Sequence, residues 1–299
     1  MNKEYEVIVI GAGPAAFTAA TFLARANVKT LVIGDPAQSG LMDAAEVWNY
    51  PGFPSGISGK ELLNNMREGA VKQGASFLLG EVVHAEELRV ASNEWRVGSF
   101  KIKTADTKEF FAQQLVLAHG ANFIKTNLPG EQELIGKGVH YCALCDGPLY
   151  RGKEVTVLGN GNMAAEEALQ LAGMGAIVKK IVTQAIVANM TPAYQAALAE
   201  KKIPVEIGRI TEITPANTPL FIALGVASSL TFAQKLGLEM NGNFLKADEQ
   251  GRTNVPGVWV AGLARGGVNQ VAKSVGEAAV VAVAIIKELK GLPQYLDHT

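Results

Sequence analysis

The chain has only two cysteines among its 299 residues, and both lie in the segment from Cys142 to Cys145. A secreted scaffold held together by several disulfide bonds needs more cysteines, so that class is excluded. Lysine plus arginine number 27 and aspartate plus glutamate number 28, which gives a net charge of −1. Proteins that bind nucleic acid usually carry a basic excess, so we expect no nucleic-acid partner.

Long apolar runs are lacking as well. The longest, Ala278 to Ile286, is too short to cross a bilayer, so we expect no membrane span. The N-terminus, from Met1 to Glu6, leads straight into a strand-like run without the features of a signal peptide, which predicts a cytoplasmic protein. With 48% apolar and 18% charged residues the chain is expected to fold, and its length suits about two domains.

Near the N-terminus the chain has the pattern of a dinucleotide-binding unit. A strand is predicted at 5–10, then the turn Gly11-Ala-Gly-Pro-Ala-Ala16, a helix to about Ala26 and a strand at 28–33. The glycines allow a tight bend and a close approach of a pyrophosphate, which then lies at the start of the helix. Asp35 stands about 20 residues past the glycines, where a carboxylate can bind an adenosine ribose.

The pattern occurs a second time in the middle of the chain. A strand at 154–158 precedes Gly159-Asn-Gly-Asn-Met-Ala164, a helix through about Gly173 and a strand at 177–182. Here Lys179 to Gln184 offer neither an acid for a ribose nor an arginine for a 2′-phosphate. The second turn therefore either binds phosphate without a nicotinamide-nucleotide selector or is a vestigial turn that binds nothing.

A late strand and helix suggest that the first domain is split in sequence. The strand predicted at 257–261 and the helix at 270–289 resemble parts of the opening unit, and a further buried strand is expected at 114–118. We therefore predict an α/β protein with two Rossmann-like dinucleotide-binding domains. The first domain would comprise residues 1–117 and 245–299, and residues 118–244 would form a smaller inserted domain that carries both cysteines.

The cysteine pair reads Cys142-Ala-Leu-Cys145 and is followed directly by Asp146. A disulfide across two intervening residues is typically reducible and catalytic, and an adjacent acid could exchange the thiol proton. Two other readings stay open: a zinc half-site that includes His140, or two inert buried thiols. A dithiol exchanges electrons with a soluble carrier through a cofactor such as a flavin, so a redox pair with two dinucleotide units predicts a flavoprotein disulfide oxidoreductase.

The chain resembles the low-molecular-weight thioredoxin reductases over most of its length and in the family's order. The matching segments are Gly11–Ala15, Glu46–Pro54, Gly56–Gly59, Leu128–Glu131, Val139–Gly147, Tyr150–Val155, Ala165–Ala168 and Val255–Val258. The resemblance implies a homodimer, a split FAD-binding domain and a thioredoxin-like protein as partner.

The same resemblance implies roles for individual residues. Cys145 would lie next to the flavin, Cys142 would attack the disulfide of the partner, and Asp146 would be the acid–base group. The residues expected to bind FAD are Gly11, Gly13, Pro14, Ala15, Asp35, Gly40, Asn49, Val83, Gly120, Gly262, Gln270 and Val271. We expect no resident metal ion.

The chain departs from the family pattern at the nucleotide sites. Gly34 stands where the family has an acid, and Leu263 replaces an aspartate that holds the flavin ribityl chain. Val182-Thr-Gln184 falls where the family has His-Arg-Arg for NADPH, and residues 209–221 are too few for the family's hairpin. These departures predict a donor other than NADPH.

Relatives without the NADPH site accept electrons from ferredoxin or hold a second FAD, and in the ferredoxin-linked ones an aromatic residue of the C-terminal tail can cover the flavin. Tyr295 is the candidate here. We favour a ferredoxin-type donor that serves a thioredoxin-like protein. The alternatives are an NADPH enzyme with an altered selector, a two-flavin oxidoreductase, and a non-catalytic flavin- or metal-binding redox sensor.

His140 could lower the pKa of Cys142 or be structural. The two glutamates in Ala164-Ala-Glu-Glu-Ala168 need no catalytic role on a helix face.

Overall fold

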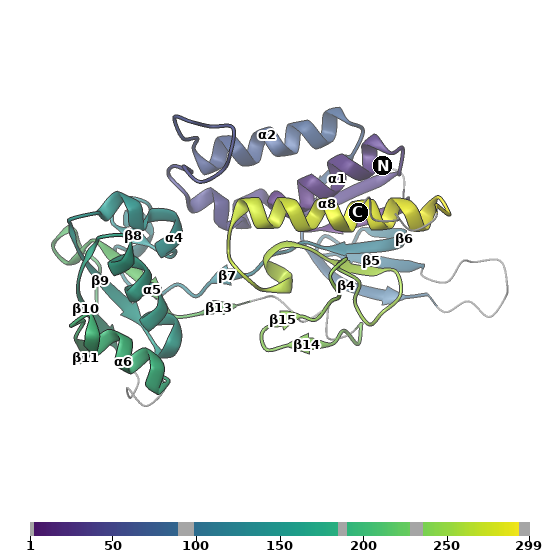
Figure 1. Cartoon of the computed structure of the whole chain (residues 1–299). Helices are drawn as coiled ribbons and strands as arrows, with labels where there is room; N and C mark the ends of the chain where they lie inside the picture. The colour runs from purple at the N-terminus through teal and green to yellow at the C-terminus, as the bar shows by residue number, and fades with distance from the viewer. Residues whose placement is uncertain (1–2, 89–98, 185–189, 228–235, 293–299) are drawn as a thin grey trace, which may run out of the picture. The chain divides into compact units, whose positions relative to one another are not determined.

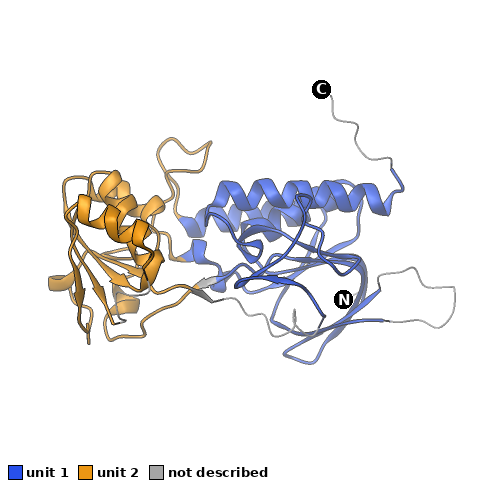
Figure 2. Cartoon of the chain, turned by 60° about the horizontal axis from the view of Figure 1, so that its bottom comes forward, with its two compact units in different colours: residues 1–42, 59–122, 228–299 blue, residues 43–58, 123–227 orange. Residues whose placement is uncertain are grey.

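A computed structural model describes residues 3–88, 99–184, 190–227 and 236–292 (Figure 1). The chain forms two compact units, each described by itself below (Figure 2). Unit 1 consists of residues 1–42, 59–122 and 228–299, and unit 2 of residues 43–58 and 123–227. Tyr295 lies outside the described residues. Among the residues that are described, no helix is long and apolar enough to cross a membrane.

Both units have the α/β architecture with Rossmann-like sheets that the sequence predicts, and unit 1 is completed by the C-terminal segment. By compactness the chain changes units at 122/123 and 227/228, and residues 43–58 group with unit 2. Short strands β7 (Asn122–Phe123) and β13 (Val226–Ala227) pair at these two passages. The functional domain limits of 117/118 and 244/245 stay predictions.

The sheet of unit 1 has seven strands and is parallel around its centre. Its order is β3-β2-β1-β6-β5-β4, and β16 pairs in parallel with the second half of β6, beyond the segment that pairs with β5. The strands β5 and β4 are antiparallel to their neighbours. The bounds are β1 (Glu4–Ile10), β2 (Thr30–Gly34), β3 (Ser76–Leu79), β4 (Val82–Glu87), β5 (Phe100–Thr104), β6 (Glu109–Leu117) and β16 (Val258–Val260).

Three long helices accompany this sheet, and α1 packs against the other two. Pro14 begins α1 because a residue in the first turn needs no free N–H, and Asn27 ends the helix region in a left-handed conformation with a φ of 56°. The elements are α1 (Pro14–Arg25), α2 (Gly59–Lys72) and α8 (Val271–Leu289), the short helices η1 (Pro36–Gln38), η2 (Gly40–Asp43) and η6 (Gly262–Arg265), and the ribbon β14 (Met240–Asn241) and β15 (Phe244–Leu245).

A buried glutamine ties the early and late parts of unit 1 together. Gln114 of β6 accepts a hydrogen bond from Nε1 of Trp259 in β16 at 2.8 Å. Its amide nitrogen donates to Glu288 of α8 at 3.0 Å. Gln114 is 5% exposed and Trp259 is 1% exposed. If either side chain were removed, water could not replace it as the hydrogen-bond partner of the other.

Unit 2 is built on a five-stranded sheet in which all neighbours are parallel. Its order is β11-β10-β9-β12-β8. The strands are β8 (Val139–His140), β9 (Glu154–Gly159), β10 (Ile177–Thr183), β11 (Val205–Ile207) and β12 (Leu220–Ala223). The helices are α3 (Glu131–Leu134), α4 (Ala143–Asp146), η3 (Gly147–Tyr150), α5 (Gly161–Gly173), α6 (Pro192–Glu200) and η5 (Pro215–Asn217).

The two glycine turns are built alike. A Cβ on Gly11, at the end of β1, would lie 2.3 Å from the carbonyl oxygen of Ala118, just past β6. A Cβ on Gly159, at the end of β9, would lie 2.3 Å from the carbonyl oxygen of Ala223, at the end of β12. Each glycine thus lets a central strand pass its parallel neighbour at a distance that no side chain permits.

Between β11 and β12 the chain is short. Residues 208–219, all of them described, contain η5 as their one regular element. This agrees with the expectation that the segment has no room for a hairpin.

The bridge through Gln114 leads to a stability prediction. Replacing Gln114 by Ala should lower the free energy of unfolding by about 1–3 kcal/mol, because the indole N–H of Trp259 stays buried without an acceptor. Urea unfolding of the purified protein measures the change. The exposed residue Gln73 is the control, and Gln73→Ala should stay within about 0.5 kcal/mol of the wild type. Equal losses in the two variants would contradict the assignment.

Candidate active site

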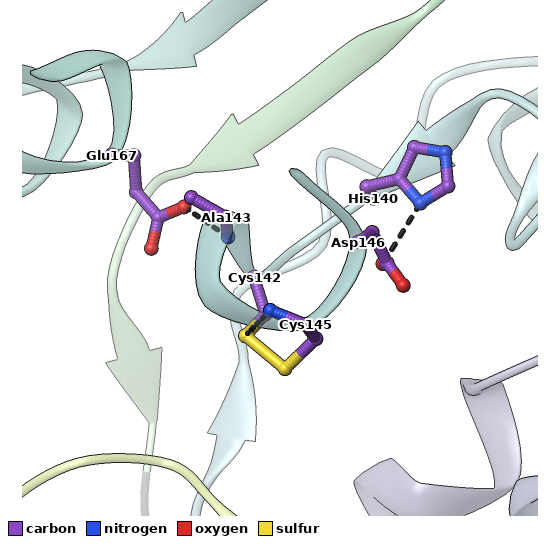
Figure 3. The surroundings of a disulfide bond; sticks show 6 residues. All are labelled: His140, Cys142, Ala143, Cys145, Asp146 and Glu167. Atoms are coloured by element: carbon purple, nitrogen blue, oxygen red, sulfur yellow. Dashed lines mark hydrogen bonds and ion pairs between the residues drawn. A yellow bond between two sulfur atoms is a disulfide. The ribbon is translucent and has the colours of Figure 1, made fainter. Parts of the chain in front are cut away.

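The two cysteines are joined in a disulfide on the one-turn helix α4 of unit 2 (Figure 3). Their Cα atoms lie 5.3 Å apart, and Cys142 stands at the N-cap position of the turn. The backbone N–H of Cys145 points at Sγ of Cys142 at 3.2 Å. Both cysteines are partly exposed.

A line of three polar side chains runs inward from the residue after the disulfide. Oδ2 of Asp146 lies 2.8 Å from Nδ1 of His140, and Nε2 of His140 lies 2.6 Å from the hydroxyl of Tyr150. The side chain of His140 is 4% exposed and that of Asp146 is 23% exposed. With a neutral imidazole, Nδ1 donates to the carboxylate and Nε2 accepts from Tyr150, which satisfies all three groups.

His140 therefore faces Asp146 and Tyr150, and it stacks on Phe221 with ring centroids 5.0 Å apart. Burial and the nearby charge of Asp146 raise the pKa of Tyr150, so its hydroxyl keeps its proton at neutral pH. Both nitrogens of the His140 imidazole have hydrogen-bond partners, and the sulfurs of the two cysteines are bonded to each other. In the described segments no group of three or more potential ligands could hold a metal ion.

A second carboxylate reaches the disulfide turn from the helix after the second glycine turn. Oε2 of Glu167, on α5, accepts from the backbone N–H of Ala143 at 2.6 Å (Figure 3). Burial raises the pKa of Glu167 to about 7, with Glu166 and Asp146 adding to the effect and the bond from Ala143 opposing it.

A third carboxylate holds the strand that leads into the cysteines. Glu131 is 3% exposed and accepts from the hydroxyl of Tyr141 at 2.6 Å, from the N–H and hydroxyl of Thr126 at 3.1 and 2.7 Å, and from the N–H of Asn127 at 2.7 Å. Burial alone would raise the pKa of Glu131, but these hydrogen bonds hold it below its usual range. Tyr141 directly precedes Cys142, so Glu131 anchors the entry to the redox turn.

In unit 1 the first glycine turn lies at the carboxyl ends of the parallel strands, where such folds bind ligands. Gly11 touches the end of β6, and a Cβ on Gly34 would lie 2.5 Å from the carbonyl carbon of Gly11. A Cβ on Gly262 would lie 2.9 Å from that of Ala15, which places the loop after β16 against the start of α1. The turn, the end of β2 and the loop after β16 therefore meet.

Comparisons with known proteins agree over the whole chain. The family described as "Pyridine nucleotide-disulphide oxidoreductase" matches residues 5–282. The thioredoxin reductase of Bacillus subtilis (strain 168) is 32% identical over 322 residues, which cover 99% of this chain and 98% of that protein. The chain belongs to the thioredoxin reductase family.

Solved structures of the family have the same fold. The thioredoxin reductase from Streptococcus pyogenes MGAS5005 is 26% identical with a TM-score of 0.83, over 97% of this chain and 100% of that one. The atypical thioredoxin reductase TRi from Desulfovibrio vulgaris Hildenborough is 35% identical with a TM-score of 0.57, over 97% and 100% of the two chains.

The protein is accordingly an FAD-binding disulfide oxidoreductase, and unit 1 fits a dinucleotide. No side chain caps the start of α1, and Pro14 there has no N–H of its own. A Cβ on Gly13 would meet only Ser39 Oγ, at 3.5 Å, and those on Gly40 and Gly120 would meet nothing within 4 Å. The N-cap of α1 at Gly13 is therefore uncrowded, which leaves room for a pyrophosphate.

The acid predicted to bind the ribose directly follows β2. A Cβ on Gly34 would strike the first glycine turn in this backbone, and the next residue along the chain is Asp35. One oxygen of Asp35 accepts from the N–H of Ala37 at 2.9 Å and thereby begins η1. Leu263 stands where the family has an aspartate, and the carboxylate that approaches its loop is that of Glu277. Glu277 accepts from the N–H of Gly262 at 3.0 Å and pairs with Lys273 at 2.9 Å.

The remaining predicted residues lie in different places. Gln270 is the N-cap of α8 and Val271 its first residue, and Ser274 of that helix lies near Gly262. Val83 lies in β4, shortly after Gly80, whose N–H faces the carbonyl of Gly34 at 3.4 Å. Asn49 belongs to unit 2, in the loop Trp48–Pro54, which lines an open hollow. The FAD roles of all these residues stay predictions.

Reasoning from the sequence missed Tyr150, Glu131 and Glu167 as parts of the redox site. For Glu167 a signal was present. Ala164, Ala165, Ala168 and Leu171 form the buried stripe of α5; Glu167 lies beside this stripe, whereas Glu166 lies on the exposed side. No comparable pattern marks Tyr150 or Glu131.

The first glycine turn leads to a prediction about the cofactor. Gly11 has a φ of +125°, and an added Cβ would strike Ala118, so Gly11→Ala should distort the turn and weaken FAD binding about tenfold or more. The flavin-to-protein absorbance ratio after purification and dialysis measures this. Gly69→Ala on α2 is the control, because a Cβ there meets nothing within 4 Å. Full flavin content in the Gly11 variant would contradict the assignment.

Proposed function

We propose that the protein passes electrons from FAD to the Cys142–Cys145 disulfide and from there to a disulfide of a thioredoxin-like protein, with a donor other than NADPH. A ferredoxin-type protein is the donor that we favour. The observation that carries the proposal is the redox turn, in which a partly exposed disulfide is followed by an acid hydrogen-bonded to a buried histidine. FAD, when bound, can accept electrons singly and deliver them in pairs.

The chemistry of the turn balances as a thiol–disulfide exchange. The Cys142 thiolate attacks one sulfur of the partner's disulfide, that bond breaks, and a mixed disulfide forms. Cys145 then attacks the Cys142 sulfur, which restores the internal disulfide and releases the second partner thiol. Each attacking thiol loses a proton and each leaving sulfur gains one, and Asp146, oriented by His140, is the group that we assign to take the proton from the first and pass it to the second.

The surface beside the disulfide suits a protein substrate. Leu144 lies between the two cysteines and Leu149 follows shortly after them, and their exposed fractions are 38% and 46%. Exposed apolar side chains beside a reactive group are typical of a surface that docks another protein. The relative named bifunctional thioredoxin reductase/thioredoxin, from Mycobacterium leprae (strain TN), supports thioredoxin as the class of partner; it is 45% identical over 169 residues.

The end of β10 supports a donor other than NADPH. Thr183 ends this strand with its hydroxyl bonded to Asn160 of the second glycine turn, at 2.8 Å. Lys179 and Lys180 pair with Glu154 and Glu206, at 3.1 and 2.7 Å, so their charges are already compensated. The tight contact of Gly159 with Ala223 explains that glycine by packing alone. A plant-type ferredoxin near about −400 mV could reduce a thioredoxin near about −270 mV.

One observation favours an NADPH enzyme with an altered selector as the second candidate. Ile207, at the end of β11, pairs with Thr183, and the exposed Arg209 follows two residues later. Arg209 therefore stands past the same sheet edge at which a 2′-phosphate would be selected. Dimerisation remains an expectation from the family resemblance, and a cytoplasmic location remains one from the N-terminal sequence.

The donor is tested with the purified yellow protein in the absence of oxygen. We expect NADPH to leave the absorbance of the oxidised flavin unchanged and a reduced ferredoxin to bleach it, with one flavin per chain. Rapid bleaching by NADPH would refute the donor proposal. If Arg209→Ala then removed that bleaching, the second candidate would hold. Two flavins per chain would favour the two-flavin alternative.

The role of the disulfide is tested separately. Cys142→Ser should abolish reduction of thioredoxin, because the attacking sulfur is gone, and should leave the flavin spectrum in place. Turnover is followed with any donor that reduces the flavin, dithionite included. Unchanged turnover in this variant would remove the cysteines from the mechanism and leave only a flavin-binding role.

A further inference from the structure

Two adjacent glutamates on α5 have different surroundings. Glu167 is half-buried and binds the backbone N–H of Ala143, next to Cys142 (Figure 3). Glu166 is exposed and lies near Gln170 and the hydroxyl of Tyr194, at 3.2 and 3.4 Å. Only the first of these neighbouring carboxylates touches the redox turn.

The carboxylate of Glu167 and the sulfur of Cys142 accept hydrogen bonds from the same turn. Glu167 accepts from Ala143 at 2.6 Å, and Sγ of Cys142 accepts from Cys145 at 3.2 Å. In the disulfide the sulfur carries no charge. After reduction Cys142 can ionise, and two negative charges would then lie at one short turn, each with its own backbone donor. Their mutual repulsion opposes the ionisation of both groups.

The other ionisable groups on the described elements packed against α5 do not offset the repulsion between Glu167 and an ionised Cys142. Of the elements packed against it, α4 contributes Asp146, held by His140, η3 contributes Tyr150, and α6 contributes Tyr194. The lysines of β10, Lys179 and Lys180, are paired with carboxylates of β9 and β11, and β12 has no ionisable residue. Burial, together with Glu166 and Asp146, raises the pKa of Glu167 to about 7, close to the range in which a thiol ionises.

We propose that Glu167 is a positioning residue that controls the ionisation of Cys142: in the reduced enzyme the two groups share one proton, so that the turn carries a single negative charge. The proposal rests on the redox-active disulfide of the proposed function. On reduction the sulfur–sulfur bond breaks and the pair of cysteines takes up two electrons and two protons. One proton goes to Cys145, and the second is held by the pair of Glu167 and Cys142.

The pair is tested by the rate at which iodoacetamide alkylates Cys142 in the reduced holoenzyme, from about pH 6 to about pH 9.5. Peptide mass spectrometry separates Cys142 from Cys145. The wild type should show two apparent pKa values, because two coupled groups lose their protons in two steps. Glu167→Gln should show one step, with alkylation at about pH 8 at least about threefold faster than in the wild type, since the competing charge is gone.

Glu166→Gln is the matched control, because it removes the same charge from the same helix one residue away, and its profile should keep two steps. Glu167→Asp keeps the charge and should retain the slower alkylation. If Glu167→Gln fails to fold, the wild-type profile decides: two steps support the pair, and a single step refutes it. Identical profiles for wild type and Glu167→Gln also refute it.

The inference and the proposed function can fail separately. If dithiothreitol cannot reduce the disulfide of the folded enzyme, and oxidised thioredoxin cannot re-form it, the proposed function fails. If the disulfide cycles normally but Glu167→Gln leaves the alkylation profile unchanged, only the inference about Glu167 fails.

Discussion

Close approach of backbone to backbone is the constraint on which both units depend. Gly11 and Gly159 each allow a central parallel strand to pass its neighbour at a separation that no Cβ tolerates. In unit 1 the same crowding extends to Gly34, where a Cβ would lie 2.5 Å from the carbonyl carbon of Gly11. In unit 2 the equivalent contact joins the end of β9 to the end of β12. The same backbone geometry thus places a glycine turn at the carboxyl end of the parallel strands in each unit.

Around the disulfide, three carboxylates have three different tasks that follow from their partners. Glu131 is ionised and fully hydrogen-bonded, so it holds the chain that enters the turn. Asp146 is partly exposed and backed by His140, an arrangement that suits proton exchange with a partner. Glu167 is desolvated and has a raised pKa, which makes its charge responsive to events in the turn. The three carboxylates thus differ in hydrogen bonding, exposure and pKa because their surroundings differ.

Much of the architecture was readable from the sequence because it rests on local periodicity. The helix expected from the first glycine turn to about Ala26 is α1 (Pro14–Arg25), and the helix predicted at 270–289 is α8 (Val271–Leu289). The spacing of Cys142 and Cys145 favoured a disulfide over a zinc half-site or two inert thiols, and the structure has the disulfide. The contacts of Glu167 and Tyr150 were not, because they depend on how α5 and η3 pack against α4. His140 could be linked to the cysteines by proximity in sequence, but the direction of its ring required coordinates.

The bridge through Gln114 bears on how the chain folds as it leaves the ribosome. The sheet of unit 2 is made from the continuous stretch 139–223, so it can assemble while the last part of the chain is still being synthesised. The sheet of unit 1 cannot be completed then, since β16 and the partner glutamate on α8 emerge last. Until that moment the outer edge of β6 is exposed, and a nascent chain paused there offers an unpaired strand to its neighbours.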